Sequence, residues 1–170
     1  MVIFIGGIHG SGKGAFCKKI SSELNIPYFT ASELLNWRDI SPNIKNKQVL
    51  DIYDTQNRLL LGLIMIKEKY ESFILDGHFC LFNNDGKVEK IAFDVFEKIS
   101  PNYIGVLNIN SAEIAKRLKA RDNIEYSIDI LNKMQTLEQE YSEEVAKQLK
   151  IPYFLINNNN PFELLTAIRN

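Results

Sequence analysis

The chain has 170 residues, of which 45% are hydrophobic and 24% are charged, and its formal net charge is −1. This length suffices for one well-buried domain, and the near-neutral charge argues against a dedicated nucleic-acid-binding protein, which usually carries a basic surplus. No apolar run reaches the roughly 20 residues that cross a bilayer, and nothing at the amino terminus has the form of a signal peptide, so we expect a cytoplasmic protein without membrane attachment.

Five short apolar runs are separated by stretches with helical periodicity. Four of the five runs are nearly continuous and lack alternation, which is typical of central strands in a parallel sheet covered on both faces. The predicted strands are Val2–Gly6, Pro27–Ala31, Ser72–Asp76, Tyr103–Ile109 and Pro152–Asn157.

The intervening segments predict helices. Thr30–Glu33 has the form of a capping box, a threonine followed three residues later by a glutamate, and it opens a short helix through Trp37. Because strand and helix alternate throughout, we predict an α/β fold of three layers, with a five-stranded parallel sheet and helices on both faces. The other predicted helices run from the glycine-rich loop to about Leu24, over about Lys47–Lys69, from Asn110 onward, over Ser127–Leu149 and from Pro161 onward.

The segment GIHGSGKG follows the first strand and opens the first helix, which is the context that a phosphate-binding loop requires. Glycines let successive N–H groups point at one phosphate, and the helix amino terminus adds partial positive charge. Lys13 supplies a point charge for the β- and γ-phosphates of ATP. His9 lies inside the loop, where it either touches phosphate or fills space. The predicted ATP-binding residues are Gly7, His9, Gly10, Ser11, Gly12, Lys13, Gly14 and Ala15.

The last loop position carries Gly14, where a serine or threonine usually helps to hold Mg²⁺. Neither Gly14 nor Ala15 offers an oxygen, so Mg²⁺ must be held by phosphates, water and another carboxylate. Asp76 is the candidate, binding the metal through water, because it ends the third strand at the edge where ligands bind in open α/β sheets. The alternative is that Asp76 caps the following turn. His78 faces the same cleft and is a candidate for orienting the substrate.

Arginines are the side chains that grip a phosphate with two hydrogen bonds. Arg117 and Arg121 are spaced four residues apart and share one helix face near the cleft, although a solvated basic face is the alternative. Arg38 follows Thr30 and Ser32, and Arg58 is either a site residue or half of a surface ion pair with Asp54.

Four segments together resemble the adenylate kinase type of nucleoside monophosphate kinase: GSGKG, TASELLNWR, FILDGH and AKRLKARD. A DTQxR stretch at Asp54–Arg58 and a D-x-H at Asp76–His78 bring the chain closer to the archaeal-type adenylate kinases. In that family a glycine follows the loop lysine, so Gly14 is expected.

The resemblance implies roles for the remaining polar residues. Thr30 and Arg38 would hold the acceptor, with Ser32, Gln56, Arg58 and His78 as further substrate-binding candidates. Lys13, Asp76, Arg117 and Arg121 would be the catalytic residues.

We therefore predict a single P-loop kinase domain over residues 1–170, with an acceptor-binding region at about 30–70 and a reduced lid at about 117–128. It would move the γ-phosphoryl of ATP, with Mg²⁺, to a small acceptor, most simply a nucleoside monophosphate such as AMP. The chain departs from the family at Ala15, where a threonine is common, and it has no arginine between Arg58 and Arg117. A kinase for another small acceptor, and a slow ATPase or nucleotide sensor acting through a partner, remain open.

Overall fold

The computed structural model describes residues 1–34, 52–82, 87–123 and 125–170, with the side chains of 52–57 excepted. Its main sheet has five parallel strands in the order β2-β3-β1-β6-β7. β1 occupies the centre, and all five of its residues are buried. This confirms the predicted sheet. The strands are β1 (Val2–Gly6), β2 (Tyr28–Thr30), β3 (Phe73–Asp76), β6 (Tyr103–Asn108) and β7 (Tyr153–Asn157).

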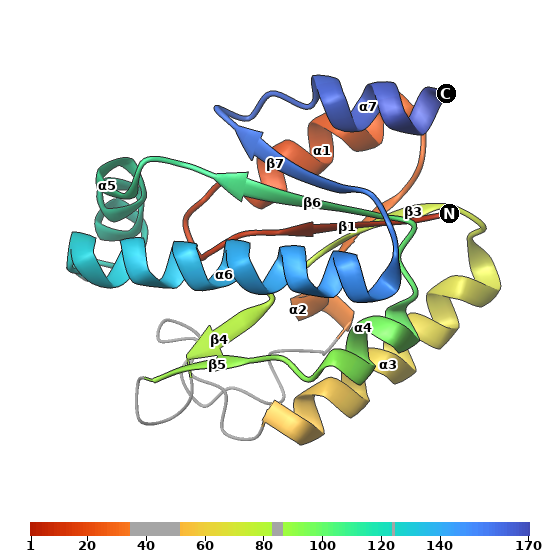
Figure 1. Ribbon diagram of the computed structural model, residues 1–170, viewed down its shortest axis with the longest axis horizontal. Helices are drawn as coiled ribbons and strands as arrows, with labels where there is room; N and C mark the ends of the chain where they lie inside the picture. The colour runs from red at the N-terminus through yellow and green to blue at the C-terminus, as the bar shows by residue number, and fades with distance from the viewer. Residues whose placement is uncertain (35–51, 83–86, 124) are drawn as a thin grey trace.

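Helices cover both faces of the sheet (Figure 1). α1 (Lys13–Leu24) and α7 (Phe162–Arg169) pack on one face, and α3 (Ile52–Lys69), α4 (Phe93–Ile99) and α6 (Ile128–Leu149) pack on the other. Successive side chains of β1 point to opposite faces, so Ile3 and Ile5 join the core under α1 and α7, whereas Val2 and Phe4 join the core under α3, α4 and α6. The two cores enclose the sheet and place its carboxyl edge at the phosphate loop.

The short helix α2 (Ala31–Leu34) begins as the capping box predicts. The Thr30 N–H donates to Glu33 Oε2 over 2.9 Å, and the Glu33 N–H donates to Thr30 Oγ1 over 3.0 Å. The predicted continuation to Trp37 lies outside the described residues, as do the first five residues of the helix expected from Lys47. Helix α5 (Ser111–Asp122) follows β6, and Asn110 caps it through a 2.9 Å bond from the Ala112 N–H, also as expected.

Three elements were not predicted. A two-stranded antiparallel sheet joins β4 (Cys80–Phe82) to β5 (Val88–Lys90), and α4 follows it. The strands have three residues each and the helix has seven, so neither is long enough to show a clear period in the sequence. Tertiary burial stabilises them, because Val95, Phe96 and Ile99 are each no more than 2% exposed.

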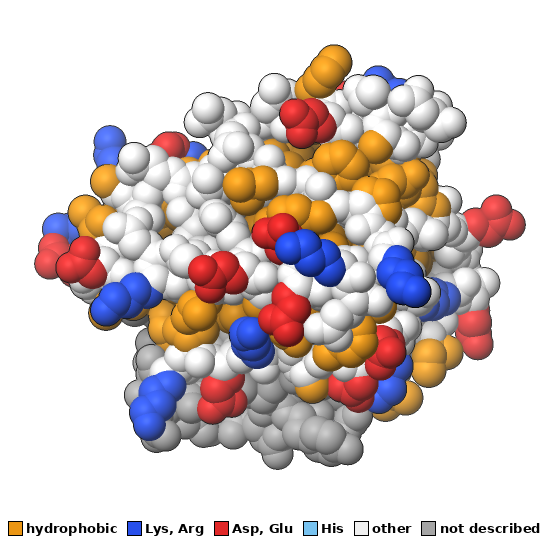
Figure 2. Space-filling view, in the orientation of Figure 1, with side chains coloured by type: hydrophobic (Ala, Val, Ile, Leu, Met, Phe, Trp, Pro, Cys, Tyr) orange, Lys and Arg blue, Asp and Glu red, His pale blue; other side chains and the backbone are white. Residues whose placement is uncertain are grey.

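Charged side chains of both signs are interspersed over the face that carries α6 (Figure 2). On this helix Lys147 pairs with Glu143 over 2.9 Å, and Glu144 pairs with Lys90 over 3.0 Å. Cys17 and Cys80 are buried free thiols, one in each of the two cores. Within the described ranges, the helices lack the combination of length and apolar character that a membrane span needs.

Candidate functional site

The phosphate loop lies between β1 and α1, and three of its glycines have backbone angles that favour glycine, among them Gly7 with a φ of +140°. Gly10 has a φ of +81° and Gly12 has a φ of +92°. A Cβ atom at Gly10 would lie 2.9 Å from Leu118 Cγ and 3.0 Å from Ile114 Cγ2, so this glycine also lets the loop pack closely against α5. Gly12 is the N-cap of α1, and the first turn of that helix contains no acidic side chain. Its unpaired N–H groups therefore favour an anion.

The Lys13 ammonium group is already oriented by the loop. Lys13 is 8% exposed, and its Nζ donates to the Gly7 carbonyl over 2.7 Å and to the Ile8 carbonyl over 3.3 Å. These two hydrogen bonds fix the position of the amine. A phosphate bound to the N–H groups at the amino terminus of α1 would therefore meet a positive charge that is already in place.

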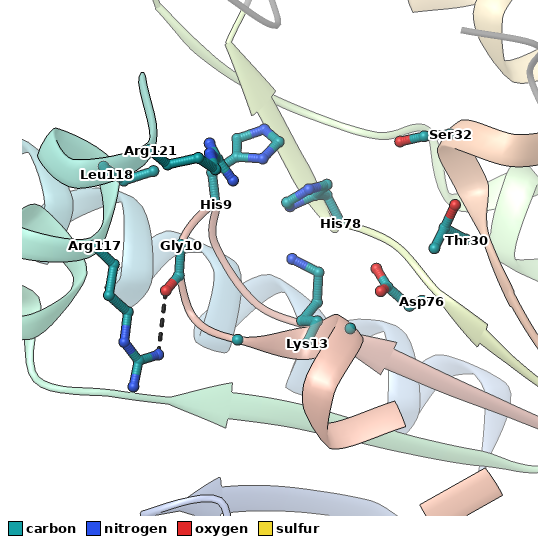
Figure 3. A pocket seen from close by; sticks show the side chains of 12 residues that line it. His9, Gly10, Lys13, Thr30, Ser32, Asp76, His78, Arg117, Leu118 and Arg121 are labelled. Atoms are coloured by element: carbon teal, nitrogen blue, oxygen red, sulfur yellow. Dashed lines mark hydrogen bonds between the residues drawn. The ribbon is translucent and has the colours of Figure 1, made fainter. Parts of the chain in front are cut away.

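A cavity of about 350 Å³ opens beside the loop at the carboxyl edge of the sheet, and Figure 3 shows the side chains that line it. Lys13, at the start of α1, and Asp76, at the end of β3, lie near one another in this space. Eleven of the predicted site residues line this cavity, together with Leu118. They are His9, Gly10, Gly12, Lys13, Gly14, Thr30, Ser32, Asp76, His78, Arg117 and Arg121.

Asp76 and Thr30 are brought together by strand register. Thr30 of β2 pairs with Asp76 of β3, and Ile5 of β1 pairs with the same aspartate. Both side chains therefore emerge where the strands end, and Ser32 lies beside them on α2 (Figure 3). This wall carries hydroxyl and carboxylate oxygens, and a second wall carries the loop and the Lys13 amine.

His9 and His78 form a pair of imidazole rings across the cavity mouth. Their ring centroids are 4.1 Å apart and the planes are inclined by 51°. His9 comes from the loop and His78 from the segment after β3, so the contact joins the two walls. Both residues remain candidates for contact with bound phosphate.

Arg117 and Arg121 both lie on α5 but have different surroundings. Arg117 Nη1 donates to the carbonyls of Gly10 over 3.4 Å and Ser11 over 3.3 Å, and its Nη2 pairs with Glu113. Arg121 donates to Asp122 through Nε over 2.7 Å and through Nη2 over 2.5 Å. Arg117 thus braces the loop from outside, whereas Arg121 lies beside His9 at the cavity wall (Figure 3).

Ser11, Ala15 and Arg58 are described by the structure but are not among the residues that line the cavity. The Ser11 side chain is fully buried and its N–H donates to the Ile8 carbonyl, so its side chain faces the interior. Ala15 and Arg58 are exposed, on α1 and α3 respectively. Gln56 lies in α3, with its side chain among those not described, and Arg38 lies outside the described residues.

Glu138 of α6 contacts the phosphate loop and was not among the residues predicted from the sequence. Its side chain is fully buried beneath the loop, where Oε1 accepts the N–H groups of Gly7 over 3.0 Å and Phe79 over 2.9 Å. Oε2 accepts the Cys80 N–H over 2.7 Å. His78 Nδ1 lies 4.0 Å from Oε1. One carboxylate therefore ties the start of the phosphate loop to the segment that follows Asp76.

The environment of Glu138 sets opposing influences on its ionisation. The pKa of the Glu138 carboxyl is raised by its burial, an effect only partly offset by the hydrogen bonds from Phe79, Cys80 and Gly7 and by the charge of Lys13. Three N–H groups donate to this side chain, and the ionised carboxylate can accept all three. If the carboxyl were protonated, one of its oxygens would carry an O–H donor next to an N–H donor. The sequence could have indicated the burial of Glu138 by its position, because it lies on the same face of α6 as the buried residues Leu131, Met134, Tyr141 and Val145.

Replacing Gly10 by alanine should weaken nucleotide binding and destabilise the loop. The new Cβ would contact Leu118 and Ile114 at no more than 3.0 Å, and the positive φ would add strain of about 1–3 kcal/mol. The free energy of unfolding from urea titration, measured alongside ADP affinity by calorimetry, checks this. Unchanged values for both would contradict the close packing of the loop against α5.

Comparison with known proteins agrees with the geometry of this site. The profile of the AAA domain family matches residues 6–135, a span that contains the loop, Asp76 and both α5 arginines. UMP-CMP kinase 3 from Oryza sativa subsp. japonica is 27% identical over 138 residues, covering 73% of this chain and 63% of that protein. The chain thus spans less than two thirds of the length of this relative.

Solved structures show the same fold at lower sequence identity. A gluconokinase from Sinorhizobium meliloti matches with a TM-score of 0.56 and 14% identity, covering 98% of this chain and 87% of its own. An uncharacterized protein from Eubacterium ventriosum matches with a TM-score of 0.51 and 14% identity, covering 99% of this chain and 96% of its own. The five-stranded parallel sheet with helices on both faces is therefore a P-loop kinase fold.

Proposed function

The chain belongs to the AAA domain family, and on that premise we propose that it is an ATP-dependent phosphotransferase acting on a nucleoside monophosphate, most simply AMP. The observation that carries the proposal is the single cavity in which Lys13 and the amino terminus of α1 face Asp76 and Thr30. A cavity lined both by a phosphate-binding loop and by hydroxyl and carboxylate oxygens suits a donor and an acceptor bound side by side.

Lys13 and the N–H groups of the loop would bind the β- and γ-phosphates of ATP, and Arg117 would keep the loop in shape through the Gly10 carbonyl. Asp76 fits as the carboxylate that holds Mg²⁺ through water, because it is an oxygen ligand at the edge of the same cavity. When bound, Mg²⁺ would neutralise charge on the transferring phosphoryl group.

Thr30 and Ser32 would place the acceptor, with His78 between the two walls and Arg121 near the transferring group. Arg38, Gln56 and Arg58 remain proposed acceptor residues in the region of about 30–70. The segment of about 117–128 would act as a reduced lid in a single kinase domain. Rate acceleration in such a site comes from positioning and charge stabilisation, without a covalent intermediate.

A nucleoside monophosphate acceptor is supported by the name of the rice relative and by the sequence elements shared with archaeal-type adenylate kinases. The two sources differ on the base, since the relative is named for UMP and CMP. We place AMP first because Thr30, Asp76 and His78 follow the adenylate kinase pattern and line the cavity together.

The proposal is tested by following ADP formation from ATP and Mg²⁺ with AMP, UMP or CMP, or with no acceptor. We expect AMP to stimulate ADP formation by orders of magnitude over the rate without acceptor. Stronger stimulation by UMP or CMP would reassign the base and retain the reaction class. A rate of ADP release indifferent to every acceptor would overturn the proposal in favour of a slow ATPase.

A further inference from the structure

The phosphate loop lacks a hydroxyl at Gly14, and a hydroxyl from another strand lies next to that position. A Cβ atom built on Gly14 would have Tyr28 Oη at 3.5 Å as its nearest contact among the described residues outside the local backbone. That distance is an ordinary van der Waals contact. Tyr28 therefore places an oxygen beside the space that the side chain of a loop serine would occupy.

Strand register explains why the Tyr28 hydroxyl is there. Tyr28 begins β2 and pairs with Ile74 of β3, two residues before the Thr30–Asp76 pair. Side chains two apart on a strand share a face, so Tyr28, Ile74 and Asp76 all project toward α1. The Tyr28 ring accordingly packs against the same core as Ile74 and Cys17 under this helix.

The Tyr28 hydroxyl is neutral at physiological pH, as a tyrosine ordinarily is, and its surroundings favour the neutral form further. Burial, and then the negative charge of Asp76, raise the pKa of Tyr28 to about 12. A phenol with so high a pKa retains its proton at physiological pH and both donates and accepts hydrogen bonds. It thus resembles a serine or threonine hydroxyl in charge and in hydrogen-bonding capacity, and it lies within the electrostatic reach of Asp76.

We infer that the Tyr28 hydroxyl takes the role of the missing loop hydroxyl and, together with Asp76, holds the water shell of the Mg²⁺ ion that accompanies the nucleotide. This inference rests on the proposed function. Mg²⁺ in nucleotide sites keeps several of its waters and is bound through few protein oxygens, so an outer hydroxyl and a carboxylate suffice. In this arrangement the first turn of α1 has no side chain at Gly14, and the hydroxyl comes from Tyr28 of β2 instead.

Tyr28→Phe removes only the oxygen and tests the inference by binding. The affinity of Mn²⁺ for the protein–ADP complex, read by electron paramagnetic resonance, should fall roughly 3- to 10-fold, as expected for one lost hydrogen bond. ADP affinity without metal should stay unchanged. Tyr103→Phe is the matched control, because the Tyr103 hydroxyl donates to the Ala167 carbonyl over 3.3 Å, away from the cavity.

A second substitution distinguishes a role of Tyr28 in holding the metal ion from a role in packing. Gly14→Ser in the Tyr28→Phe protein returns a hydroxyl to the loop and should restore Mn²⁺ affinity. A merely structural role for Tyr28 predicts no such rescue. Unchanged Mn²⁺ affinity in Tyr28→Phe, or failure of Gly14→Ser to restore a lost affinity, would overturn the inference while metal-free ADP binding persists. If the unsubstituted protein binds no ADP with or without metal, the proposed function fails as well.

Discussion

Replacing Glu138 by alanine should lower the free energy of unfolding by about 3–9 kcal/mol, because three buried N–H groups lose their acceptor at about 1–3 kcal/mol each. The groups belong to Gly7, Phe79 and Cys80, which lie within 3.0 Å of the carboxylate. The loss would extend to the site, since Gly7 begins the phosphate loop. Urea unfolding and ADP binding measure the two effects.

Glu138→Gln and an exposed neighbour provide the controls. The glutamine keeps one carbonyl oxygen but turns an NH₂ group toward at least one N–H donor, so its stability should fall between those of the alanine variant and the unsubstituted protein. Glu140→Gln changes an exposed residue two positions along the same helix and should have little effect. If Glu138→Ala were as stable as Glu140→Gln, the carboxylate would not be the anchor of the loop.

Replacing Lys13 by alanine should reduce kcat/KM for ATP-dependent phosphoryl transfer by about 10²- to 10³-fold or more, the loss typical of one fixed transition-state donor. The amine is the positive group that the Gly7 and Ile8 carbonyls hold at the mouth of α1. In the Lys13→Ala protein, only the helix N–H groups would remain to stabilise the negative charge of the phosphoryl group during transfer. The measurement is steady-state ADP formation with the best acceptor.

Lys19→Ala is the matched control for Lys13→Ala, because Lys19 is an exposed lysine of the same helix. It should leave turnover unchanged. Circular dichroism and urea unfolding show whether Lys13→Ala retains the fold, so that loss of activity is assigned to the charge. Normal turnover by a folded Lys13→Ala protein would mean that the loop does not bind the donor phosphates.

The sheet and the phosphate loop were predictable because their signals are local. A buried parallel strand is a continuous apolar run in the sequence. A glycine-rich segment between a strand and a helix has a loop conformation that its own residues determine. Asp76 was placed at the cavity because the carboxyl end of a strand is a position in the sequence as well as in space. These features can be predicted without knowing which segments pack against them.

The rest depends on how distant segments pack. Glu138 sits within a helix whose pattern reads as amphipathic, and only the docking of α6 beneath the loop shows that its carboxylate meets three N–H groups. Arg117 shares a helix face with Arg121, yet the orientation of α5 turns it onto the Gly10 and Ser11 carbonyls. Tyr28 went unnoticed because a strand residue gives no sign of which loop its hydroxyl will reach. The roles assigned to the site residues, including Arg38 and Gln56, stay predictions.

The bond between Gly7 and Glu138 also orders events during protein synthesis. The two residues are 131 positions apart, so the phosphate loop leaves the ribosome long before the carboxylate that anchors it. β1 likewise waits for β3 and β6, its two neighbours in the sheet, which both come later in the chain. An incomplete chain that ends before α6 therefore presents the glycines of the loop without their anchor.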